Sequence, residues 1–285
     1  MTRRQILSLL ILTVSAPAQP RRIVSTSPSI TEILFALGLG PQVVGVSEYC
    51  RFPAAVKQLP KVGTYLRPNS EQIARLQPDL VILHKLSNDV AARMTALGIR
   101  HLEVDRGGLL NLYTMIEKIG TESGVGPRAR ELIATIRSQL ADLVSQSAGL
   151  PRPKVLFVVG RQLGTLSNLV TAGSDSYLNE LIRIAGGRNV LDDSSLPAYP
   201  RISMETVVRL DPDVLIDVAD PMVGTPSSNE RQKEVATLWA QQTGLAAVRS
   251  KRVYALDSQA FVVPGPRVVE VARSLFAIFH PQEAK

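Results

Sequence analysis

The sequence predicts an α/β protein of two similar lobes, each with a central parallel sheet, bridged by one long α-helix. Short apolar segments alternate with helical segments along the chain, an order typical of parallel βα units. A helix–turn–strand motif occurs twice: Ser70–Leu83 reads SEQIARLQPDLVIL and Met204–Asp217 reads METVVRLDPDVLID. Between the copies, Pro127–Ser147 carries apolar residues at helical spacing and neither glycine nor proline after its first residue, which predicts the linking helix.

The first half of the chain alternates strands and helices. Gly38 and Gly98 end two of the helices, and Pro78 ends a third helix, which Asn69 caps. The predicted strands are Ile23–Ser25, Val43–Val46, Leu80–Leu83 and His101–Val104, and the other predicted helices are Thr31–Leu37 and Ala91–Leu97.

The second half repeats this order. Ser203 caps the second copy of the motif at the position that Asn69 has in the first. The predicted strands are Val155–Val159, Asn189–Leu191, Val214–Ile216 and Arg252–Leu256, and the predicted helices include Tyr177–Ile184, Trp239–Val248 and Pro266–Phe279. We therefore expect an N-terminal lobe at 19–124, the linking helix at 125–150 and a C-terminal lobe at 151–285.

Residues 1–18 have the features of a signal peptide. Arg3 and Arg4 precede the apolar run Ile6–Val14, and Ala16-Pro17-Ala18 fits an A-x-A cleavage signal. The apolar run is too short to span a bilayer as a mature helix. We therefore expect an exported, soluble protein.

Composition narrows the choice of partners. The formal charge of +7 falls to +5 when Arg3 and Arg4 are removed with the signal peptide, and the remaining excess forms no basic block. Nucleic acid is therefore not an expected partner. Cys50 is the only cysteine, so no intrachain disulfide can form, and we expect a monomer whose core suffices for stability.

No catalytic motif stands out. The sequence lacks G-x-S-x-G, H-E-x-x-H and Walker A motifs, and His84, His101 and His280 are too scattered to predict a metal site. A secreted hydrolase that uses Ser25 or Ser27 as its nucleophile remains an alternative. The sequence offers no plausible Ser-His-Asp set to support it. A structural or adhesion module of the cell envelope is a third alternative, but it would not need a two-lobed cleft. A ligand-binding protein would use that cleft to hold its ligand.

Several side chains are candidates for that cleft because they lie in loops after strands or before helices. His84 follows a buried strand at the edge where open parallel sheets bind ligands. Tyrosines can stack on a flat ligand, and arginines can pair with its carboxylate, phosphate or amide groups. The alternative is structural: a loop tyrosine can instead pack against the edge of a lobe, and a loop arginine can simply be solvated. The candidates are Tyr49, Tyr65, His84, Tyr199, Arg67, Arg161 and Arg201.

The duplicated motif keeps a glutamate in both copies, Glu71 and Glu205. The shared leucine, proline and aspartate are explained by core packing, helix termination and a turn. The glutamates lie in the first helical turn, where a carboxylate interacts favourably with the helix dipole by ~0.3–1 kcal/mol. That explanation is sufficient when the residues are considered alone.

Four segments together resemble the substrate-binding proteins of bacterial ABC importers for vitamin B12 and iron–siderophores, over nearly the whole mature chain. They read IVSTSPSITEILFALGLGPQVVGVSEYCRFP, VGTYLRPNSEQIARLQPDLVI, PRISMETVVRLDPDVLI and FVVPGPRVVEVARSLFAIFHP. The vitamin B12-binding members look closest, through Thr64-Tyr65, Pro197–Glu205 and Pro264–Arg267.

The resemblance implies a helical-backbone periplasmic binding protein fold with limited hinge motion. It also implies a periplasmic location, no enzymatic activity and no cofactor. The expected ligand is a large metal chelate, cobalamin first, with a ferric siderophore or haem as the alternative. In that family one glutamate on each lobe docks onto arginines of the ABC transporter permease dimer, and the matching residues here are Glu71 and Glu205.

This sequence departs from the family pattern in the expected cleft. Tyr65, Tyr199 and His84 stand where tryptophans occur in a B12-binding member, whereas Tyr49 matches a tyrosine. These replacements imply a less apolar, more cationic cleft than cobalamin alone would require.

Overall fold

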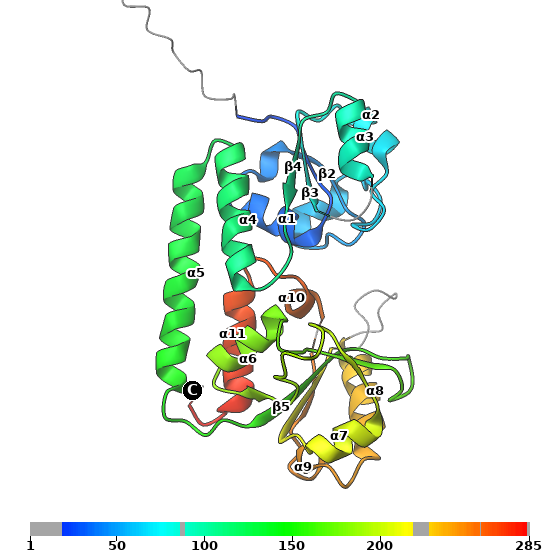
Figure 1. Ribbon diagram of the computed structural model, residues 1–285, viewed down its shortest axis with the longest axis vertical. Helices are drawn as coiled ribbons and strands as arrows, with labels where there is room; N and C mark the ends of the chain where they lie inside the picture. Colours follow the sequence, from blue (N-terminus) through cyan, green and yellow to red (C-terminus); the bar gives the residue numbers. More distant parts are fainter. Residues whose placement is uncertain (1–18, 86–88, 219–227, 257, 284–285) are drawn as a thin grey trace, which may run out of the picture.

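The computed structural model describes residues 19–85, 89–218, 228–256 and 258–283. It has two α/β lobes connected by a long helix, with further helices packed beside that helix (Figure 1). The predicted signal peptide lies outside the described residues. Within the described ranges, no helix combines the length and the apolar character needed to cross a bilayer.

The N-terminal lobe contains a fully parallel sheet in the order β2-β1-β3-β4. Its strands are β1 Ile23–Ser25, β2 Val43–Val46, β3 Leu80–His84 and β4 His101–Val104, and its helices are α1 Pro28–Ala36, α2 Ser70–Arg75, α3 Val90–Ala96 and α4 Leu109–Glu122, with short 3₁₀ helices at Gly40–Gln42 and Ala54–Gln58.

The central strand β3 is buried on both faces, which explains its uninterrupted apolar sequence. Leu80 and Ile82 face the core that contains α1 and α4, whereas Val81 and Leu83 face α2 and α3.

The C-terminal lobe contains a mixed sheet in the order β10-β9-β5-β6-β8, with β7 also paired to β5. Its strands are β5 Lys154–Gly160, β6 Leu169–Thr171, β7 Arg188–Asn189, β8 Arg201–Ile202, β9 Val214–Asp217 and β10 Val253–Ala255. Its helices are α6 Tyr177–Ile184, α7 Met204–Leu210, α8 Ser228–Ala240, α9 Ala246–Arg249, α10 Ser258–Val262 and α11 Val268–Phe279.

Helix α5 (Gly126–Ser147) links the lobes and occupies the segment predicted for the linking helix. Ile136, Leu140 and Leu143 are buried along it and belong to one hydrophobic core that includes Ile116 of the N-terminal lobe and Phe276 of the C-terminal lobe. Helices α4 and α11 both pack against α5. Because side chains from both lobes pack into one core, the lobes cannot separate without exposing apolar surface.

The duplicated motif repeats in geometry as well as in sequence. The carboxylate of Asp79 accepts hydrogen bonds from the backbone N–H groups of Arg21 and Arg22, at 2.8 and 3.0 Å, where the chain enters β1. Asp213 does the same for the N–H of Lys154 at 2.7 Å, at the start of β5. The repeated aspartate therefore secures the first strand of its own lobe and does more than form a turn.

Two predictions need correction, and helix α4 is an element that was not predicted. Trp239–Val248 is not one helix, because α8 ends at Ala240 and α9 begins at Ala246, with Gly244 in the interruption. Helix α4 was not predicted, although its apolar residues fall at helical spacing. The C-terminal sheet is not purely parallel, because β6 pairs antiparallel with both β5 and β8.

Candidate functional site

A cavity of about 600 Å³ lies between the lobes and is lined by residues of both. It lies beyond the carboxyl ends of β1, β3 and β4, as shown by the lining residues Ser27, His84 and Asp105. The carboxyl ends of parallel strands are the usual ligand side of an open α/β sheet. The fold therefore places this cavity where a ligand is expected.

Helices α1, α4, α6 and α11 begin at the cavity, and the lining includes Pro28, Gly107, Ser176 and Arg267 from their first turns or the residues just before them. A helix N-terminus carries partial positive charge and free N–H groups. The convergence of these ends favours a ligand with acceptor or anionic groups.

Aromatic side chains form much of the wall. The rings of Tyr49 and Tyr65 meet edge to face, with their centroids 6.4 Å apart and an interplanar angle of 64°. Phe52 and Tyr199 remain 45% and 43% exposed while lining the cavity. Aromatic rings from both lobes therefore line one cavity, where they can stack on a flat ligand.

His84 is the last residue of β3 and lines the cavity, although it is only 5% exposed. Its Nε2 lies 3.0 Å from Oγ of Ser27 and 3.2 Å from Oγ of Ser29, at the start of α1. Burial lowers the pKa of His84 from its ordinary value of 6.5 to about 4. The imidazole is therefore neutral at physiological pH and is held by hydroxyl groups.

Arginine and carboxylate groups are both part of the lining. The guanidinium of Arg106 lies 6.0 Å from the centroid of the Tyr65 ring. Arg267 donates from Nε and Nη2 to the two carboxylate oxygens of Glu32, at 2.9 and 2.5 Å, and its guanidinium lies 4.2 Å from the centroid of the Phe52 ring. Burial raises the pKa of Glu32, and the hydrogen bond and charge of Arg267 oppose that rise.

The structure brings Tyr49, Tyr65, His84 and Tyr199 to one cavity. The remaining candidates, Arg67, Arg161 and Arg201, do not line it.

Arg161 is buried inside the C-terminal lobe, where its Nε donates to the carboxylate of Asp217 at 2.9 Å. The indole N–H of Trp239 donates to the same oxygen at 2.8 Å. Asp217 therefore joins Arg161 to Trp239 of α8 and ties that helix to the sheet.

The cavity also contains residues that sequence reasoning missed, including Glu32, Phe52, Arg106, Asn111 and Arg267. Asn111 belongs to α4, which was not predicted. Glu32 and Arg267 lie on different lobes, and no local pattern indicates that they meet. A positional signal was available for Arg106, because it follows a predicted strand as His84 does.

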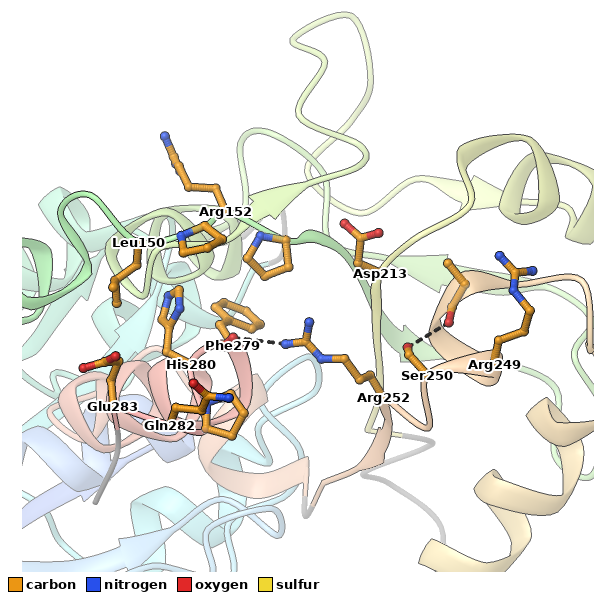
Figure 2. A pocket seen from close by; sticks show the side chains of 14 residues that line it. Leu150, Arg152, Asp213, Arg249, Ser250, Arg252, Phe279, His280, Gln282 and Glu283 are labelled. Atoms are coloured by element: carbon orange, nitrogen blue, oxygen red, sulfur yellow. Dashed lines mark hydrogen bonds between the residues drawn. The ribbon is translucent and has the colours of Figure 1, made fainter.

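A second, larger hollow of about 910 Å³ opens at the far end of the C-terminal lobe (Figure 2). Its arginines are engaged by backbone carbonyls: Arg252 donates to Ile278 and Phe279 at 3.1 Å, and Arg152 donates to Gly187 at 3.1 Å. These side chains cap and support the local fold, so the cavity between the lobes is the better functional site.

Within the part of the chain that the structure describes, no cluster of three or more His, Cys, Asp or Glu side chains could hold a metal ion. The cavity thus offers aromatic rings, hydroxyl groups and arginines rather than a dedicated metal centre. Such a lining suits the binding of a whole ligand.

Comparison with known proteins identifies the family. Residues 23–260 match the model of the periplasmic binding protein family, and the chain therefore belongs to that family. It is 29% identical to an uncharacterised ABC transporter substrate-binding lipoprotein of Bacillus subtilis, over 95% of this chain and 84% of that protein.

Two further similarities bear on the ligand. The chain is 30% identical to a vitamin B12-binding protein of Salmonella typhimurium, over 76% of this chain and 79% of that one. A periplasmic haem-binding protein from Pseudomonas aeruginosa superposes with a TM-score of 0.79 at 28% identity, over 92% of this chain and 94% of that one. The chain is thus a substrate-binding protein of the B12, haem and iron importer class, and not an enzyme.

The low pKa of His84 predicts a pH dependence of stability. In the unfolded chain this histidine takes up a proton near its ordinary pKa of 6.5, whereas the folded protein resists protonation until about 4. The free energy of unfolding should therefore fall as pH drops from 6.5 to 4, by at most about 3 kcal/mol from this residue.

His84→Gln should remove this contribution, because glutamine can bond to the serines without titrating. Urea unfolding of both proteins at several pH values measures the effect, and the difference at pH 7.5 corrects for any loss of packing. Parallel pH profiles for the variant and the wild type would contradict the prediction.

Proposed function

We propose that this protein is exported to the periplasm, captures a large, flat metal chelate between its lobes and delivers it to an ABC transporter permease. The observation that carries the proposal is the cavity walled by Tyr49, Tyr65, Phe52 and Tyr199, which brings exposed rings from both lobes to one space. A planar macrocycle buries both of its faces only when the opposed walls are aromatic or apolar.

Cobalamin is the first candidate ligand. The similarity to a vitamin B12-binding protein supports it. Corrin amides and the phosphate of the nucleotide loop would find donors in Arg51, Arg106 and the helix N-termini at the cavity.

Haem is the second candidate, with a ferric siderophore after it. Haem carries two carboxylates, which suit a cavity with arginines and converging helix N-termini, and tyrosine phenols are known ligands of haem iron. The similarity to a haem-binding protein supports this alternative. The neutral imidazole of His84, which lines the same cavity, could also ligate the iron.

Delivery requires a contact with the permease, which we assign to Glu71 and Glu205. Both side chains are exposed, one on α2 of the N-terminal lobe and the other on α7 of the C-terminal lobe. A hydrogen bond with Ser203 lowers the pKa of Glu205. One carboxylate per lobe fits a two-fold symmetric permease that carries cationic residues.

Calorimetric titration with cyanocobalamin, haemin and a set of ferric siderophores tests the proposed function directly. We expect one of these chelates to bind tightly and the others weakly or not at all. Failure of every chelate to bind would overturn the proposal.

The aromatic wall predicts the effect of two substitutions. Tyr65→Ala and Tyr199→Ala should each weaken binding of the identified chelate by ~1 kcal/mol or more, roughly fivefold, because each removes a stacking surface. Tyr113→Ala is a suitable control, since Tyr113 packs over Arg137 on α4 and α5, outside the cavity. Unchanged affinity in both cavity variants would place the ligand elsewhere.

The docking assignment predicts a separation of binding from transport. The double variant Glu71→Arg/Glu205→Arg should lose ligand uptake, because the introduced arginines repel the cationic residues of the permease. Its affinity for the ligand, measured by calorimetry, should stay at the wild-type value. Glu131→Arg, at an exposed position on α5, should transport normally. A double variant that loses affinity as much as uptake would refute the docking role.

A further inference from the structure

Two other glutamates occupy matching positions in the lobes. Glu32 lies in α1, the first helix after β1, and Glu180 lies in α6, which follows β5 and β6 in the C-terminal lobe. Aligning Glu32 with Glu180 also aligns Gly38 with Gly186, the glycines that follow the two helices, and both glycines have positive φ, of 76° and 80°. The glutamates thus belong to the same internal duplication as Glu71 and Glu205.

Each glutamate reaches across to the other lobe. Glu32 forms its two-point ion pair with Arg267, the residue immediately before α11. The carboxylate of Glu180 accepts the backbone N–H of Leu109 at 2.9 Å, at the start of α4. Helix α4 follows the last strand of the N-terminal lobe and α11 follows the last strand of the C-terminal lobe, so the two contacts are reciprocal.

The helices that receive these contacts are arranged symmetrically. Figure 1 shows α4 beside the upper half of α5 and α11 beside the lower half, one above the other. Helix α4 is antiparallel to α5 in a hairpin, and the end of α11 lies near the end of α5, where His280 and Ser147 both approach Gly186. The N-termini of α4 and α11 therefore meet between the lobes, where carboxylates are electrostatically favoured.

Glycines make room for both carboxylates. A Cβ at Gly265 would lie 3.0 Å from Oε2 of Glu32, and a Cβ at Gly108 would collide with Oε1 of Glu180. Each glycine lies just before the helix that its glutamate contacts. Gly108 has φ of −74°, a value open to any residue, so space and not backbone strain explains the glycine there.

We propose that Glu32 and Glu180 form a reciprocal clasp, in which each lobe holds the last helix of the other and so fixes the width of the cavity. The Glu32–Arg267 pair is 4% and 16% exposed at its two side chains, so water weakens it far less than a surface ion pair. The clasp complements α5: the long helix sets the distance between lobe centres, and the glutamates oppose rotation about it. This role concerns the lobes themselves and does not depend on the identity of the ligand.

Distances between spin labels test the clasp without any ligand. Labels on cysteines introduced at Gln72 and Val208, which are exposed on α2 and α7, report the separation of the lobes in a Cys50→Ser background. Wild type should give one narrow distance distribution. Glu32→Ala/Glu180→Ala should broaden it and add a component at longer distance.

The control must destabilise one lobe without touching the clasp. Asp217→Asn weakens the buried Arg161–Asp217 pair within the C-terminal lobe; it should lower the melting temperature and leave the distance distribution narrow. An unchanged distribution in the double glutamate variant, or equal broadening in Asp217→Asn, would overturn the proposal.

A second variant keeps both glutamates, in case the double variant does not fold. Gly108→Ala should displace the Glu180 carboxylate from the N–H of Leu109 and broaden the distribution in the same direction. Gly244→Ala is its matched control, because a Cβ at Gly244 meets no atom within 4 Å. A distribution in Gly108→Ala identical to that of Gly244→Ala would refute the role of Glu180.

Discussion

The architecture depends on burial of both faces of two short sheets. In each lobe one face packs toward α5 and belongs to a single core that runs through the molecule, while the other face forms a separate core under the outer helices. Because parallel strands enter their helices at one edge, strand ends and helix starts gather there. Joining two such lobes through α5 turns these edges toward each other, and the cavity is the space between them.

Electrostatics in this space come from the backbone as much as from side chains. The charged residues that line the cavity are Arg51, Arg106, Arg267, Glu32, Asp105 and Asp175, so cations and carboxylates are both present. The positive ends of the converging helices act in addition to them. Two carboxylates of the protein itself interact near those ends: Glu32 pairs with Arg267 before α11, and Glu180 accepts the N–H of Leu109 in α4. The same feature of the fold therefore serves both ligand binding and lobe spacing.

Much of the fold could be predicted because its signals are local. The alternation of apolar strands and capped helices, the repeated motif and the long helix depend on neighbours in sequence. Helix α4 and the antiparallel β6 were missed: the first lacks a side-chain cap, and β6 is a short segment (Leu169–Thr171) whose pairing direction is decided by tertiary contacts. In the candidate site, Tyr49, Tyr65, His84 and Tyr199 were found because they occupy loops or strand ends at the sheet edge. Arg161 was placed there by the same reasoning, although the structure buries it against Asp217.

By itself the sequence determined the two-lobed α/β class, the duplicated motif with its paired glutamates, and the family resemblance that the comparisons confirm. These properties follow from short-range patterns of polarity, capping and turn residues. Only the tertiary structure decided which loop residues face one another, that Glu32 meets Arg267, and that Glu180 reaches the start of α4. Those contacts join residues far apart in the chain, and their partners are set by how two lobes pack around α5, which no local pattern records.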